Sequence, residues 1–218
     1  MVKNKAFRLS TVVFLFLWTL FTLYPQPIDL VKSIYRLISP PVNPYAEGLD
    51  FFFQSDLSES PSSLEKKVKS VIVYQYDWQT YNLPWYFPTI EEVLEKKAGD
   101  CKSQMLILAS VLEYQRKEYT IKASPTHLWV HYEEKGENSS ENNDVVLISY
   151  DGSSGIHIPK IDFIRSFNLF KIAFWDYMPN NKKTLLFSGL FIFFSLNLLP
   201  FFAFYKNFPL VLLGIKKG

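Results

Sequence analysis

Hydrophobic and polar positions divide the chain into three parts, of which the two outer ones are apolar. Residues 9–24 and 184–205 contain no charged side chain. As helices they would be about 24 Å and about 33 Å long, against a membrane hydrocarbon core of about 30 Å. A basic and an aromatic residue flank the first run and would extend it to the membrane interfaces. The pattern predicts an N-terminal transmembrane anchor within residues 1–25 and a second transmembrane helix over residues 183–205.

Basic residues near the N-terminus predict the orientation of the two spans. Lys3, Lys5 and Arg8 precede the first span without an acidic residue, which favours a cytoplasmic N-terminus. Two spans return the short tail of residues 206–218 to the same side and leave the middle of the chain on the extracytoplasmic side. A cleaved secretory signal is the alternative, but the run ends in Tyr-Pro-Gln-Pro rather than in a small-x-small cleavage site. We therefore expect a two-pass membrane protein.

Residues 26–63 are predicted to form a membrane-proximal helix and a linker. Over residues 28–38, apolar residues recur at helical spacing with charged residues between them, as in an amphipathic helix near a membrane surface. The apolar positions are Leu30, Ile34, Leu37 and Ile38, and the charged ones are Asp29, Lys32 and Arg36. Three prolines end this helix, and the polar residues 54–63 have the composition of a linker.

The main domain, over residues 64–182, mixes helical and strand patterns. Its first helix is expected at about residues 63–73. Thr89, with Glu92 three residues later, forms the capping box of a second helix. Gly99 is expected to end that helix in a left-handed conformation. The domain closes with three predicted strands, over residues 119–123, 127–132 and 145–150.

Cys101, the only cysteine of the chain, is placed at the start of the third helix of this domain. The sequence KSQMLILASVLEYQ that follows it has a largely apolar middle, which predicts a helix buried inside the domain. The N-terminus of a helix presents unpaired N–H groups and partial positive charge, which favour a thiolate and can bind an oxyanion. A lone cysteine is more often a small buried hydrophobe, but such a residue belongs in mid-helix. The position therefore indicates a nucleophile.

His127 and Asp151 are the candidate base and the carboxylate that orients it. His127 opens the second predicted strand, and Asp151 follows the third. If these two strands form an antiparallel hairpin in the register we assume, His127 and Asp151 lie side by side. A carboxylate there would hold the imidazole in the tautomer that accepts the thiol proton. Because the register is an assumption, Glu141 and Asp144 remain alternative carboxylates.

Other interpretations of these residues stay open. Taken alone, His127 is at least as typical of a core histidine whose ring nitrogens are hydrogen-bonded to backbone as of a catalytic base. Asp151 is likewise at least as typical of a residue that starts a turn. A zinc site built from His127, His131 and His157 is the metal alternative, although this spacing on a strand is not a metal motif. We expect no metal and no cofactor.

The segment 74–87 is dense in aromatic residues and interrupted by a proline. It would either fill gaps in the core or form an aromatic wall beside a substrate groove. In the second case Trp78 and Trp85 contact substrate, together with Gln104 on the helix of the cysteine and Trp129 on the strand of the histidine.

Two motifs carry a family resemblance. Gly-Asp-Cys at 99–101 opening an apolar helix, followed by His-Leu-Trp-Val at 127–130 opening a strand, resembles the transglutaminase-like superfamily. The tyrosines ahead of the Pro-Thr-x-Glu helix start are also similar, and the match covers about residues 64–155. The resemblance implies a papain-like α+β fold, with the cysteine on a central helix packed against an antiparallel sheet. It also implies a triad of Cys101, His127 and Asp151.

Composition narrows the function further. The formal net charge of +2 gives no support for nucleic acid binding, and a single cysteine excludes an intramolecular disulfide. Family members include cross-linkers, peptidases, amidases and some without catalysis. We predict a membrane-anchored cysteine enzyme, a peptidase, amidase or acyl transferase, that acts on amide bonds of a protein or peptide, with hydrolysis favoured. The alternative is a catalytically silent module of the same fold that binds a peptide or a membrane-protein partner.

Overall fold

The structure, a computed structural model, describes residues 2–53, 59–136, 141, 143–150 and 163–212. The chain forms two compact units. One consists of Met1–Pro27 together with Pro179–Gly218, and the other is the continuous segment Ile28–Met178. Each unit is described below by itself.

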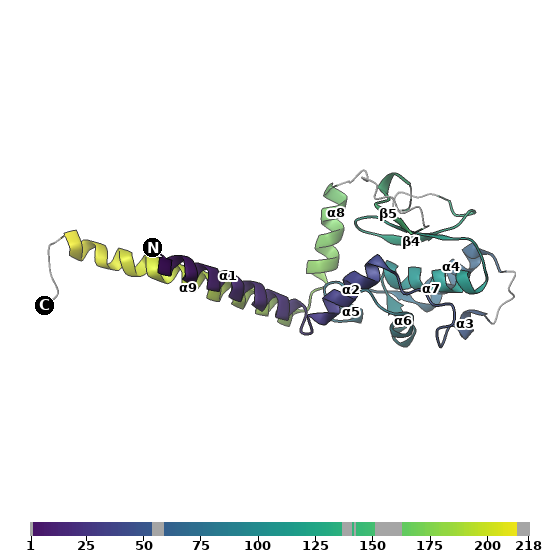
Figure 1. The fold of residues 1–218 in the computed structure, drawn as a ribbon, viewed down its shortest axis with the longest axis horizontal. Coiled ribbons are helices and arrows are strands. Elements are labelled where there is room, and N and C mark those ends of the chain that lie inside the picture. Colours follow the sequence, from purple (N-terminus) through teal and green to yellow (C-terminus); the bar gives the residue numbers. More distant parts are fainter. Residues whose placement is uncertain (1, 54–58, 137–140, 142, 151–162, 213–218) are drawn as a thin grey trace. The chain divides into compact units, whose positions relative to one another are not determined.

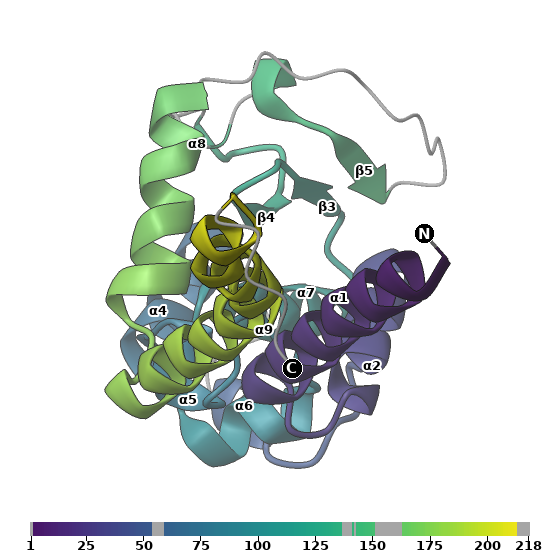
Figure 2. The same ribbon diagram turned by 90° about the vertical axis from the view of Figure 1, so that its left-hand side faces the viewer.

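The first unit is an antiparallel helix pair of α1 (Val2–Leu23) and α9 (Asn180–Leu212), which lie side by side in Figures 1 and 2. Polar groups join the two helices along their length: the indole nitrogen of Trp18 donates to the carbonyl oxygen of Leu185 at 2.7 Å. The side-chain amide of Asn197 donates to the hydroxyl of Thr11 at 3.3 Å.

The same helix pair leaves its apolar side chains exposed. Among the described side chains, the large exposed ones on α1 are Phe7, Leu9, Val12, Val13, Phe16, Leu17 and Phe21, and α9 exposes eight comparable residues between Leu185 and Leu198. By length and hydropathy, no single helix within the described residues qualifies to cross a membrane; only Phe7–Leu23 and Ile28–Ile38 taken together, with a bend at the break between them, meet that criterion.

The second unit mixes helices with two small sheets, so the expected combination of α and β structure is confirmed. Its helices in chain order are α2 (Ile28–Ile38), α3 (Asp50–Phe53), α4 (Pro61–Val71), α5 (Asp77–Thr80), α6 (Ile90–Lys96), α7 (Cys101–Tyr114) and α8 (Phe163–Phe170). A 3₁₀ turn, η1 (Asn143–Val145), and a π-helix, η2 (Lys171–Asp176), complete them. The strands are β1 (Val73–Tyr74), β2 (Ala98–Gly99), β3 (Thr120–Ala123), β4 (Leu128–His131) and β5 (Ile148–Tyr150).

The strand order differs from the predicted hairpin. The three-stranded sheet has the order β4-β3-β5, so β3 lies between the two strands that we expected to pair. Ile121 of β3 is opposite Val130 on one side and Tyr150 on the other. The assumed pairing of the histidine strand with the last strand is therefore wrong, and β5 ends level with Val130 rather than with His127.

Helix α7 forms the centre of the core, and it packs against β4, α4 and α6 (Figure 1). Leu106, Ile107, Ala109, Val111 and Leu112 have no measurable exposure. A helix that is apolar on all sides is stable only when other elements cover every face. The sequence prediction of a buried helix beginning at Cys101 is thus confirmed.

Helix α6 shows one confirmed and one wrong prediction. Thr89 and Glu92 form the expected capping box, since each side chain accepts a hydrogen bond from the backbone N–H of the other. The left-handed residue after the helix is Lys97, with φ of 50°, and not Gly99, which belongs to the parallel pair β1–β2. Gly99 serves close packing instead, because a Cβ there would lie 2.1 Å from Oγ of Ser103.

Candidate active site

The start of α7 places Cys101 at the edge of the core. Asp100 is the N-cap residue, and its carboxylate accepts from the backbone N–H of Lys102 at 3.0 Å. An acidic N-cap satisfies one of the free N–H groups of the first turn and favours helix formation from this point. The Cys101 side chain is partly exposed, whereas Lys102, Ser103 and Met105 in the following turn are buried.

A buried ion cluster fixes this first turn. The ammonium of Lys102 contacts the carboxylates of Asp100 and Asp77, the latter at 3.0 Å, and all three residues are buried. Burial opposes the charge of Lys102, but the two carboxylates outweigh it and hold the pKa of Lys102 above its usual range. Burial also raises the pKa of Asp77, which shares this one ammonium with Asp100. The carboxylate of Asp77 also accepts a hydrogen bond from the protein backbone, because the N–H of Tyr86 donates to its Oδ2 at 2.9 Å.

A tight turn before β4 positions His127. The backbone N–H of Ser124 donates to the carbonyl oxygen of His127 at 2.8 Å, and the N–H of His127 donates back to Oγ of Ser124 at 3.0 Å. The imidazole is stacked on the Trp129 indole, with ring centroids 5.7 Å apart and planes inclined by 13°. These contacts restrain both the backbone and the ring of His127.

The imidazole of His127 interacts with both Cys101 and Glu141. Nε2 of His127 lies 3.0 Å from Oε1 of Glu141. Burial lowers the pKa of His127, but hydrogen bonds to Cys101 and Glu141 outweigh it and raise the pKa to about 9. Burial would raise the pKa of Glu141, yet His127 and Lys135 lower it to about 2. At neutral pH the imidazole of His127 is therefore protonated and paired with the ionised carboxylate of Glu141.

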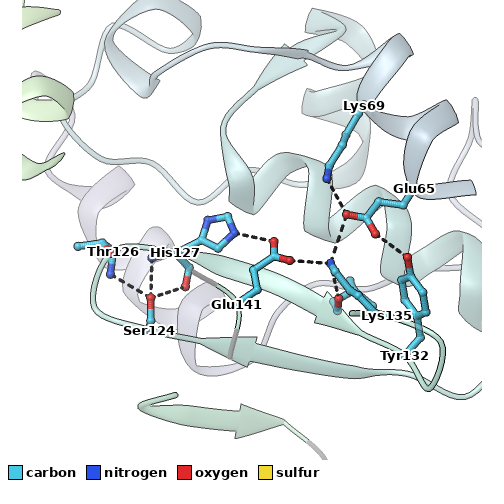
Figure 3. A network of polar contacts seen from close by, with 9 residues as sticks. Glu65, Lys69, Ser124, Thr126, His127, Tyr132, Lys135 and Glu141 are labelled. Atoms are coloured by element: carbon cyan, nitrogen blue, oxygen red, sulfur yellow. Dashed lines mark hydrogen bonds and ion pairs between the residues drawn. The ribbon is translucent and has the colours of Figure 1, made fainter. Parts of the chain in front are cut away.

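Figure 3 shows that the carboxylate of Glu141 is itself held from the other side. Nζ of Lys135 lies 3.2 Å from Oε2 of Glu141 and 3.2 Å from Oε1 of Glu65. Glu65 also accepts from the hydroxyl of Tyr132 at 2.7 Å and pairs with Lys69 at 2.6 Å. The orientation of Glu141 is thus fixed by a chain of charges that reaches α4.

A cleft of about 60 Å³ joins these groups. The side chains of Cys101, His127 and Glu141 line this cleft, which continues along α7 and β4. The remaining walls of the cleft are formed by Gln104, Met105, Leu108, Trp129, Lys135, Glu65 and others. The side chains of Cys101 and His127 therefore line the same cleft.

The structure treats the three carboxylates predicted as partners of His127 differently. Asp151 lies outside the described residues. Asp144 is exposed within η1. Glu141, the other alternative from the sequence, is the one carboxylate that the structure places on the imidazole of His127 within the described residues.

The four tentative substrate residues divide between the cleft and the core. Gln104 and Trp129 line the cleft, with the amide of Gln104 donating to the carbonyl oxygen of Ile72 at 3.0 Å. Trp78 is 3% exposed and donates to the carbonyl oxygen of Phe174. Trp85 packs against the main core cluster. The positions of the last two favour the core-filling alternative for the aromatic segment.

The zinc alternative included His157, which lies outside the described residues. Within the described part of the chain, no group of three or more potential metal ligands occurs.

Sequence reasoning gave no role to Lys135, Glu65, Asp77 or Lys102. Charged residues at those positions are typical of a protein surface, and only their contacts in the structure show that they belong to the site.

Comparisons with protein-family models, with curated proteins and with solved structures found no match.

Proposed function

We propose that this protein is a cysteine enzyme of transglutaminase-like type that hydrolyses an amide or peptide bond, and that α1 and α9 anchor it in a membrane. The observation that carries the proposal is that Cys101 and His127 line one cleft, in which the carboxylate of Glu141 lies 3.0 Å from Nε2 of His127. A nucleophile, its base and an orienting carboxylate in one cleft are the components of covalent amide hydrolysis.

In the proposed mechanism the thiolate of Cys101 attacks the carbonyl carbon, and a C–S bond forms. The backbone N–H of Cys101 at the N-terminus of α7 donates to the oxyanion. The imidazolium of His127 then gives its proton to the amide nitrogen, the C–N bond breaks, and the amine leaves an acyl-thioester behind. His127 next takes a proton from water, which attacks the thioester and releases the acid and the thiol.

Glu141 takes the orienting role that the sequence assigned to Asp151. Because Nε2 of His127 faces Glu141 at 3.0 Å, Nδ1 is the nitrogen that remains for the sulfur and the leaving group. The carboxylate stabilises the imidazolium and holds the ring in one orientation. The cation of Lys135 on its other oxygen keeps Glu141 ionised.

The helix pair supports the anchoring part of the proposal. Many of its large apolar side chains are exposed, whereas the polar side chains of Thr11 and Asn197 contact each other between the two helices. Helices in lipid associate through such polar contacts and through small residues. Gly189 is an example, since a Cβ there would lie 2.2 Å from the indole of Trp18.

Alkylation of the single cysteine tests the catalytic part. The full chain, in detergent, is treated with iodoacetamide between pH 6 and 9, a window around the pKa values of free imidazole and thiol, and the adduct is followed by mass. The wild-type rate is expected to fall less steeply below pH 8 than that of a free thiol, because His127 stays protonated until about pH 9 and its positive charge favours the thiolate form. In His127→Ala the rate at pH 6.5 should fall by about tenfold or more and should follow a free thiol, with an inflection near pH 8.5. A wild-type inflection near 8.5 that His127→Ala leaves unchanged would exclude the catalytic pair.

Matched carboxamide variants identify the third member. Glu141→Gln is expected to shift the alkylation profile towards that of His127→Ala, whereas Asp144→Asn and Asp151→Asn leave it in place. The opposite result for Asp151→Asn would restore the triad that the sequence predicted. Cys101→Ala in the same assay gives the background, and an acyl adduct trapped on Cys101 in native membranes would identify the substrate.

A further inference from the structure

Helix α2 has its polar side turned towards the domain. Ser33 is fully buried, and its Oγ accepts from the backbone N–H of Phe87 at 3.0 Å. Arg36 donates to the carbonyl oxygen of Phe87 at 2.8 Å and contacts the carboxylate of Glu92 at 3.2 Å. An amphipathic helix on a soluble domain ordinarily buries its apolar stripe instead. Ser33 and Arg36 thus attach the hydrophilic face of α2 to the domain, and Leu37 also packs against the main core.

The apolar side of α2 is consequently exposed. Its exposed fractions run from 47% to 70%, and the residues are Ile28, Val31, Ile34, Tyr35 and Ile38. Their spacing of three and four places them on one stripe along the helix. Such a contiguous apolar stripe on a folded domain marks a contact surface rather than chance exposure.

Helix α8 presents a second stripe of the same kind. None of its residues is buried, and four apolar side chains are 60% to 78% exposed: Phe163, Ile164, Phe167 and Phe170. Arg165 is its one charged residue, and it has no acidic one. The helix continues into η2, where Phe174 packs on Trp78 and fixes the attachment to the domain.

Both stripes lie on segments that are tethered closely to the helix pair. Five residue steps separate Leu23 of α1 from Ile28, and four separate Asp176 from Asn180 of α9. At about 3.5 Å per step, the tethers reach at most about 18 Å and about 14 Å. The two tethers start at one end of the pair, because Nζ of Lys182 donates to the carbonyl oxygen of Thr22 at 2.7 Å.

We propose that α2 and α8 dock the catalytic domain on the surface of the lipid bilayer, with their apolar stripes in the interfacial layer. The inference rests on the anchoring of α1 and α9, since their ends would then hold both stripes within reach of that layer. A bilayer accepts two separate stripes without a complementary groove. Lys32 and Lys171, which are both about half exposed and pair with Asp29 and Asp176, would be within reach of anionic headgroups in this arrangement.

Fluorescent probes on the full chain test the docking. In a Cys101→Ala background, single cysteines at Ile34→Cys and Phe167→Cys carry an environment-sensitive dye, and Lys66→Cys and Glu95→Cys serve as exposed controls on α4 and α6. The labelled proteins are reconstituted in vesicles of phosphatidylcholine and phosphatidylglycerol. Probes on the two stripes should show blue-shifted emission and severalfold stronger quenching by nitroxide-labelled lipids than the controls.

Extraction with alkaline carbonate separates the two ways to fail. Protein that stays in the vesicles while its stripe probes behave like the controls would overturn the docking and leave the anchors in place. Protein that leaves the vesicles would overturn the anchors, and the docking with them. Blue-shifted emission without lipid quenching, rising with protein concentration, would assign the stripes to a second copy of the chain and so overturn the bilayer as the occupant.

Discussion

The helix pair of α1 and α9 and the domain of residues 28–178 differ in what they bury. In the domain, the fully buried side chains are mainly aliphatic and aromatic, and they surround α7. In the helix pair, Thr11 and Thr22 are among the buried residues, while phenylalanines and leucines are exposed. The first arrangement is that of a domain in water, and the second places apolar side chains where a membrane would surround them.

The difference teaches how to interpret the two intermediate helices. α2 and α8 belong to the domain by their contacts, yet their exposed side chains resemble those of the helix pair. In α2, Ser33 and Arg36 face the domain and the isoleucines are exposed. This pattern fits neither a helix surrounded by water nor a helix surrounded by lipid. We therefore expect substitutions of buried residues in the domain to reduce stability by much more than substitutions in the helix pair.

The largest loss of stability is expected when the buried ion cluster around Lys102 is disrupted. Lys102→Met would leave Asp77 and Asp100 without their shared cation, and removal of one partner of a buried ion pair costs about 3–5 kcal/mol. Chemical denaturation of the full chain in detergent measures the loss. Lys66→Met on the exposed side of α4 is the matched control and should change the free energy of unfolding by less than about 0.5 kcal/mol. A loss below about 1 kcal/mol at Lys102 would mean that the cluster is structurally dispensable.

A matched pair of leucines compares the two units directly. Leu106→Ala empties a fully buried site in α7 and should cost about 2–5 kcal/mol. Leu190→Ala removes a side chain of α9 that is exposed in the helix pair, so it should leave stability in bicelles nearly unchanged. Thermal unfolding followed by circular dichroism gives both values. Equal losses at the two sites would contradict the contrast between the units.

The smallest effect is expected inside the helix pair. Asn197→Leu removes the hydrogen bond to Thr11, and such contacts between helices in lipid contribute about 0.6 kcal/mol on average. Titration with a denaturing detergent in bicelles detects a change of this size. Ser188→Ala is the control, since the hydroxyl of Ser188 bonds within its own helix, to Leu185. A larger loss in the control than in Asn197→Leu would place the helix contact elsewhere.

Local signals predicted much of the domain. The capping box of Thr89 and Glu92 and the buried helix after Cys101 lie where the sequence placed them. The three strands lie within the predicted segments, although the last is shorter, Ile148–Tyr150 instead of residues 145–150. These features depend on residues a few positions apart, whose periodicity and capping chemistry are visible in a single sequence. The placement of Cys101 at a helix start belongs to the same class.

The remaining features depend on distant partners. Strand β3 lies between β4 and β5, and nothing in the pattern of either outer strand specifies its neighbour. Glu141 reaches His127 from a polar segment whose composition indicates only a loop. The inward face of Arg36 depends on Phe87 and Glu92, more than fifty positions later. Such pairings follow from the packing of the whole domain and leave no short-range signal.

The buried ion cluster of Lys102, Asp77 and Asp100 fixes the segment that bears Cys101. Lys102 directly follows Cys101, and its ammonium ties the beginning of α7 to Asp77 at the start of α5. The segment that bears the sulfur is therefore immobilised when the chain folds rather than when a ligand arrives. An acyl donor entering the cleft would find the attacking atom already in place, and its binding free energy would not be spent on ordering that segment.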